Sequence, residues 1–97
     1  LPETAPVGIW GQRRRHYLKT QHRPLYNALL LGGKLNDHLI AVDTQAETMF
    51  FQLVNRLTEQ EGITEQLKVE NQMEWVRQMN GIRNQAEEII YNELICT

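Results

Sequence analysis

A long apolar repeat in the middle of the chain constrains the fold more than any other feature. Its members recur every three or four residues, the spacing that places side chains on one face of an α-helix: Leu35, Leu39, Val42, Ala46, Met49, Leu53 and Leu57. No proline or glycine occurs between Leu35 and Gly62, so the pattern predicts one helix over about residues 34–61. A single helix cannot bury such a face, so the rest of the chain must supply partner helices.

A second apolar face of helical period follows Gly62: Trp75, Val76, Met79, Ile82, Ala86, Ile89, Ile90 and Leu94. Its helix is predicted to run from residue 64 or from residue 71 to about residue 95, because Thr64 and Asn71 both suit an N-cap. The connection at Gly62 is short, so the two long helices should lie antiparallel. Gly81 within the second helix indicates either close approach of another backbone or a bend.

Two shorter helices are predicted before this pair. The first covers about residues 8–21, and the second begins near Pro24, which suits the first turn of a helix, and ends before Gly32 and Gly33. Residues 1–6 contain Pro2 and Pro6 and are predicted to form an extended leader. The whole chain, residues 1–97, is therefore predicted to be a single all-α domain: an antiparallel hairpin of two long helices with the two short helices packed across it.

Charge is distributed unevenly along the chain. Residues 1–36 contain six basic and one acidic residue, and residues 37–97 contain four basic and eleven acidic ones, so the two parts carry net charges of +5 and −7. This asymmetry indicates either an anionic partner for the basic end or pairing between the two parts. The chain has no run of about 18 apolar residues, so a transmembrane helix is not expected.

A group of basic residues in the first helix and at its end is the most informative polar feature. Arg15, Lys19 and His22 recur at helical spacing and should form an exposed stripe, flanked by Arg13 and Arg23. Such a stripe suits contact with phosphates. The alternative is a solvated face, or one paired with the acidic part of the chain.

Two other arginines fall within apolar faces and are expected to have structural roles. Arg14 lies between Trp10 and Tyr17 on the inward side of the first helix, and Arg83 lies within the second long helix. A buried guanidinium needs a carboxylate or carbonyl partner, and we expect ion pairs with residues such as Asp43 or Glu87.

The usual signatures of catalysis and metal binding are missing from the sequence. There is no serine, the one cysteine is Cys96 near the end of the chain, and no glutamate stands three residues before a histidine. Gly32-Gly33-Lys34 lacks the glycine spacing and the hydroxyl residue of a phosphate-binding loop. We therefore expect no enzyme activity, no metal and no cofactor. A helix-turn-helix centred on Gly32-Gly33 is a weaker alternative, because Asp37 and Asp43 near the start of its reading helix would repel phosphates.

Several segments of the chain resemble the transposon-encoded TnpV family, small proteins of mobile elements in low-GC Gram-positive bacteria. They are GIWG at 8–11, RRHYLK at 14–19, HRPLY at 22–26, LLLGGKLN at 29–36, EGITEQLK at 61–68 and NQMEWV at 71–76, with MN at 79–80 and IRN at 82–84. The resemblance implies carriage on a transposon or integrative element and a cytoplasmic location, and it implies no particular reaction.

Two hypotheses for function remain open at this stage. In the first, the protein is a non-enzymatic accessory protein that contacts DNA phosphates through its basic stripe. In the second, it is a helical interaction module that regulates an element-encoded recombinase or another partner without contacting DNA. Exposure of the stripe favours the first, and its burial against Glu87, Glu88 or Glu93 favours the second. A homodimer is expected in either case, because four helices leave part of the long apolar faces uncovered.

Overall fold

The computed structural model describes residues 7–97, and the predicted leader, residues 1–6, lies outside the described residues. Within that range the regular secondary structure is all helical, with no strand, which confirms the all-α class. The elements are α1 (Ile9–Gln21), α2 (Arg23–Leu31), α3 (Leu35–Gln60), α4 (Glu65–Glu70), α5 (Gln72–Ile90) and a π-helical turn, η1 (Tyr91–Ile95). The described part is elongated, with principal extents of 54 × 28 × 18 Å.

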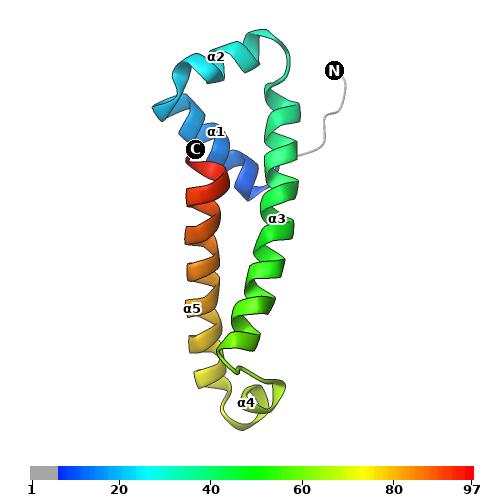
Figure 1. Cartoon of the computed structure of the whole chain (residues 1–97), viewed down its shortest axis with the longest axis vertical. Helices are drawn as coiled ribbons and strands as arrows, with labels where there is room; N and C mark the ends of the chain where they lie inside the picture. Colours follow the sequence, from blue (N-terminus) through cyan, green and yellow to red (C-terminus); the bar gives the residue numbers. More distant parts are fainter. Residues whose placement is uncertain (1–6) are drawn as a thin grey trace.

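The two long helices, α3 and α5, lie side by side and run in opposite directions (Figure 1). Gly62 follows the C-terminal end of α3. Its φ of 68° is a left-handed conformation that glycine adopts without strain. The second long helix does not remain α-helical to residue 95. Its last turn is a π-turn in which Cys96 N donates to Tyr91 O at 2.8 Å.

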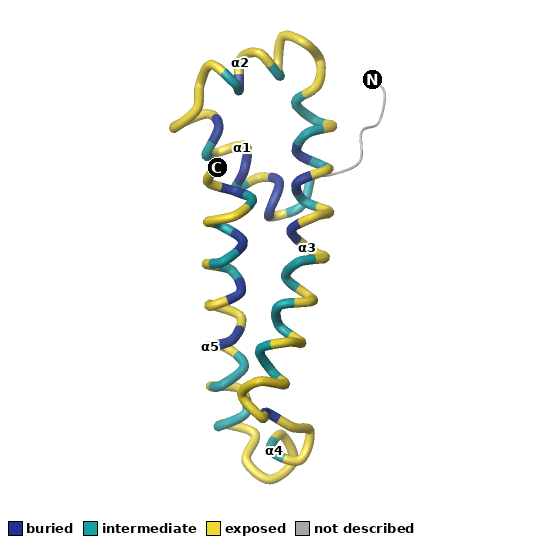
Figure 2. Tube along the Cα trace, viewed as in Figure 1, coloured by how far each residue is buried: buried dark blue, intermediate teal, exposed yellow. Residues whose placement is uncertain are grey.

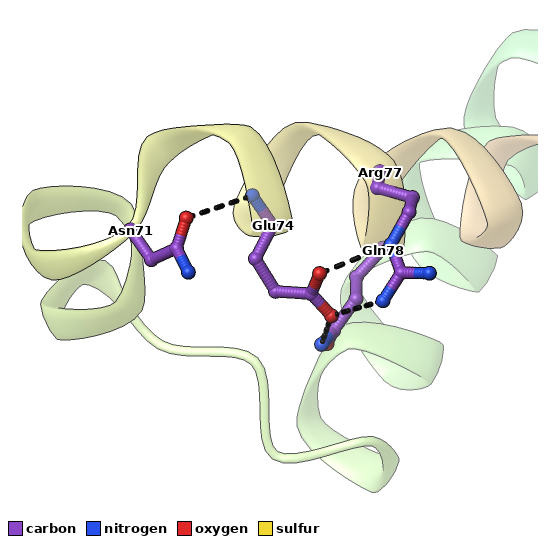
Figure 3. Close-up of polar contacts among 4 residues, drawn as sticks. All are labelled: Asn71, Glu74, Arg77 and Gln78. Carbon is purple, nitrogen blue, oxygen red and sulfur yellow. Dashed lines mark hydrogen bonds and ion pairs between the residues drawn. The ribbon is translucent and has the colours of Figure 1, made fainter.

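Side-chain caps determine where the second long helix begins. Thr64 Oγ1 accepts a hydrogen bond from Leu67 N at 3.3 Å and caps the short helix α4, which follows Gly62. Asn71 Oδ1 accepts from Glu74 N at 3.2 Å and caps α5 (Figure 3). Both predicted N-caps are therefore present, and the later of the two predicted starts is correct for α5.

The Glu74 carboxylate does not return to the Asn71 backbone, as a complete capping box would require. It accepts from Arg77 Nη2 at 2.6 Å and from Gln78 Nε2 at 2.8 Å (Figure 3). Both hydrogen bonds lower the pKa of Glu74, and the one from Arg77 has the larger effect. Asn71 N donates instead to Leu67 O at 2.8 Å.

The first helix, α1, packs against α3 and against η1, the turn that follows α5 (Figure 1), and Gly11 permits its close approach to α3. A Cβ at position 11 would lie 2.9 Å from the Leu39 carbonyl oxygen and against the Val7 side chain. At Gly81, by contrast, no described atom outside its own helix backbone lies within 4 Å of such a Cβ. The interpretation of Gly81 as a site of close backbone approach is therefore wrong within residues 7–97.

The second helix, α2, extends past the pair of long helices. It contacts α1 and α3 and makes no contact with α5, whereas both short helices were predicted to pack across the hairpin. His22 is the C-cap of α1 and the N-cap of α2, at φ −143° and ψ 53°. Because this residue is not helical, the chain changes direction there and carries α2 away from α5 (Figure 1).

The core lies where α1 meets the two long helices. Its buried cluster is Trp10, Val42, Ala46, Ile90 and Ile95, and Figure 2 shows the buried positions gathered toward that end of the molecule. Leu39, Val42 and Ala46 of the α3 repeat are buried, whereas its other members are only partly buried: Leu35, Met49, Leu53 and Leu57. Away from α1 the long helices cover one another and α4 packs against α5, which leaves each apolar face partly open.

Candidate nucleic-acid interface

Four basic side chains stand exposed along α1 and at the start of α2. Arg15 and Lys19 are one turn apart on α1, His22 lies at the junction, and Arg23 begins α2. We call these four residues the basic face. Lys19 Nζ lies 5.9 Å from the centroid of the Tyr26 ring, so this ammonium group has an aromatic neighbour and stays exposed to solvent.

Acidic partners do not neutralise the basic face. Within residues 7–97 the salt bridge that forms joins Arg77 and Glu74 at the start of α5. That site, together with Glu65 and Glu70 of α4, lies at the opposite end of the molecule from α1 and α2 (Figure 1). These acidic groups therefore lie far from the basic face, whereas Asp43 lies against α1 and Glu93 lies in η1, which packs against α1.

Arg13 does not belong to the basic face. Its guanidinium carbon lies 4.9 Å from the centroid of the Trp10 ring and 5.2 Å from that of Tyr91. These cation–π contacts hold the side chain against the C-terminal turn η1. The prediction that Arg13 flanks the phosphate-binding stripe therefore does not match its position.

Arg14 is buried, with 6% of its surface exposed, and it joins α1 to the C-terminal turn. Its Nη1 donates to Ile95 O and to Thr97 O, each at 2.9 Å, and its Nε donates to His38 Nε2 at 3.3 Å. A cation bonded to the last carbonyls of a helix also interacts favourably with the negative end of the helix dipole. The expected structural role is correct, and the partners are carbonyl oxygens rather than a carboxylate.

The predicted ion pairs of the other residues do not form. Arg83 is exposed on α5, so it needs no buried partner. Glu87 is partly buried and takes no part in a salt bridge within the described residues. Asp43 has a different role: its Oδ1 accepts from Gly11 N at 3.0 Å and so satisfies a free N–H at the start of α1.

His38 is a member of this network that sequence reasoning missed. Burial, and secondarily the charge of Arg14, lower the pKa of His38. Burial likewise lowers the pKa of Arg14. Neutral His38 offers Nε2 as an acceptor, so the histidine and the guanidinium form a compatible pair only while the histidine is unprotonated. Ile95 O is 81 residues away from Arg14 in sequence, and no local pattern signals such a contact.

The start of α3 is not free to read DNA as a recognition helix. His38 is bonded to Arg14, and Leu39 is buried beneath α1. Both residues lie in the first two turns, where a helix-turn-helix would place its base contacts. The position of α1 therefore disfavours the helix-turn-helix alternative.

Residues 7–97 bring together no group of three or more histidine, cysteine, aspartate or glutamate side chains that could hold a metal ion. In the same range no helix is both long enough and apolar enough to cross a membrane. The described residues define a small, elongated helical protein whose most distinctive polar feature is the basic face.

Comparison with known proteins supplies the family. The chain matches the family described as transposon-encoded protein TnpV over residues 1–95, and it therefore belongs to that family. This match confirms the resemblance noted in the sequence. Neither a curated protein nor a solved structure matched the chain. The family description gives the genetic origin of the protein and names no reaction.

Proposed function

We propose that this member of the TnpV family is a non-enzymatic accessory protein of its transposon that contacts the DNA backbone through the basic face. The observation that carries the proposal is the exposure of Arg15, Lys19, His22 and Arg23 without a salt bridge to any described acidic residue. Pairing of this face with Glu87, Glu88 or Glu93 would have favoured the protein-interaction hypothesis instead.

The spacing of the basic face suits a phosphate backbone rather than base edges. Arginine and lysine side chains one turn apart can each reach a phosphate, and such contacts orient a protein without reading sequence. Three of the four residues are arginine or lysine: Arg15, Lys19 and Arg23. Glu65 and Glu70 of α4 lie at the far end of the molecule from the basic face, so they do not oppose the approach of a polyanion to it.

The proposal is tested by fluorescence anisotropy with a labelled duplex from the ends of the transposon, over a series of salt concentrations. Neutralisation of three phosphates predicts a slope of log K against log salt of about −2.7. The double variant Arg15→Glu/Lys19→Glu should bind at least about tenfold more weakly at low salt, because two attractive contacts become repulsive.

A matched control is available on the long helices. Arg56→Glu/Arg83→Glu makes the same change in net charge at two exposed positions outside α1 and α2 and should retain most of the affinity. The DNA hypothesis is wrong if folded protein shows no binding at low salt. If both double variants lose affinity equally, the basic face is not the site at which DNA binds.

Self-association is a second proposal, supported by apolar side chains exposed near the α4 end. Val69 and Met73 are each 85% exposed, and Val76 is 42% exposed. We propose that two copies pair through these residues, which would leave both basic faces free.

Sedimentation equilibrium should then report a dimer for the unmodified protein and a monomer for Val69→Ser/Met73→Ser. The control Phe51→Ser alters another exposed apolar residue, on α3, and should remain dimeric; a monomeric unmodified protein would refute the pairing.

A further inference from the structure

A groove runs between α1 and the C-terminal turn, on a different flank of α1 from the basic face. Ile9 and Tyr17 line one side, Tyr91 and Ile95 line the other, and the volume is about 420 Å³. Ile9 is 60% exposed, so an apolar edge borders the opening. Concave, mostly apolar sites of about 300–1,000 Å³ with few polar groups are typical of small-molecule binding.

Arg13 brings an uncompensated positive charge to this groove. Its side chain lines the groove and makes no salt bridge within residues 7–97, and none of the lining residues is aspartate or glutamate. Its Nη1 is buried and has no hydrogen-bond partner among the described residues. An arginine without a counter-charge beside apolar walls leaves the groove complementary to an anion.

The Arg13 guanidinium packs against two adjacent aromatic rings. Its carbon lies 4.9 Å from the Trp10 centroid and 5.2 Å from the Tyr91 centroid. Trp10 and Tyr91 themselves meet edge to face, with centroids 6.1 Å apart. A planar guanidinium held in this way has lost its rotational freedom before a ligand arrives, so a bound anion need not order it.

We infer that this groove binds a small apolar carboxylic acid, with the carboxylate at Arg13 and the apolar body between Tyr17 and Ile95. A carboxylate matches the planar geometry of one guanidinium. A phosphate or sulfate would need several further donors, and most of the exposed surface of the groove is apolar, although Gln12, His16 and Thr20 also line it. This site is separate from the basic face, so it stands or falls independently of DNA binding.

Binding is tested with 2-naphthoate and 2-naphthamide, which share a ring system and differ in charge. Isotope-labelled protein is titrated with each compound and followed by two-dimensional NMR. The acid should give saturable shifts confined to α1 and residues 91–96, and the amide should bind at least about tenfold more weakly, because it lacks a charge-assisted hydrogen bond. This comparison uses the unmodified protein and does not depend on the folding of any variant.

Two variants locate the charge that is responsible. Arg13→Gln should weaken binding of the acid about tenfold and leave binding of the amide unchanged, whereas Arg83→Gln removes an exposed arginine of α5 and should alter neither. The inference is overturned if the acid shows no saturable binding, if acid and amide bind equally, or if Arg83→Gln reduces affinity as much as Arg13→Gln. It is also overturned if the shifts lie on the basic face instead.

Discussion

Replacing Arg14 with methionine tests the network that docks α1 onto the long helices. The change removes both hydrogen bonds to the C-terminal carbonyls and the bond to His38, and it keeps an apolar stem of similar length. Arg14 is 6% exposed and Ile95 is buried, so water has little access to the Ile95 carbonyl when it loses its donor, whereas Thr97 is exposed. We expect the free energy of unfolding to fall by about 3 kcal/mol.

The magnitude follows from these contacts. Each hydrogen bond from a charged donor contributes about 1.5–3 kcal/mol, so the two carbonyl bonds together represent roughly 3–6 kcal/mol. Methionine recovers part of this, because it is buried without the desolvation cost of a charge. A net loss of about 2–4 kcal/mol remains, which is a large fraction of the 5–15 kcal/mol typical of a small domain.

The measurement is urea unfolding monitored by circular dichroism, with the slope compared between variants to establish that the unfolded states are equivalent. Arg15→Met is the matched control, since it makes the same chemical change one residue later, at an exposed position, and should stay within about 0.5 kcal/mol of the unmodified protein. A loss at position 14 no larger than that of the control would refute the structural role of the buried guanidinium.

Three further outcomes are expected. Acidification should destabilise the protein as pH falls below the ordinary His38 pKa of 6.5, because the folded state resists protonation and the unfolded chain does not; His38→Gln should flatten this part of a stability–pH profile. Gly81→Ala should raise the free energy of unfolding by about 0.5–1 kcal/mol, whereas Gly11→Ala should lower the melting temperature through its clash with the Leu39 carbonyl. Asn71→Ala should cost about 1 kcal/mol in urea unfolding, through loss of the α5 cap.

Each of these outcomes has a contrary result. A stability profile of His38→Gln that falls as steeply as that of the unmodified protein would remove His38 as the titrating group. The two glycine substitutions should act in opposite directions, so the same sign in both would contradict the close approach at Gly11. An Asn71→Asp variant supplies an alternative capping carboxylate and should retain most of the stability that alanine loses.

Local patterns in the sequence were sufficient to predict the helices. The apolar period of α3, the glycine at position 62 and the caps at Thr64 and Asn71 act within a few residues of where they stand. Their structural consequences do not depend on distant parts of the chain. For the same reason the exposure of Arg15 and Lys19 was predictable, since both lie away from the apolar side of their own helix.

Tertiary structure alone decided which residues meet. The π-turn at Tyr91–Ile95 and the crossing of α1 over α3 bring Arg14 to carbonyls at the far end of the chain. The sequence could indicate that Arg14 needed a partner but could not identify it, because backbone carbonyls are present at every residue and leave no signature. The two glycines illustrate the same limit. Gly81 and Gly11 look alike in sequence, and only the packing of α1 against Leu39 makes one of them the contact point.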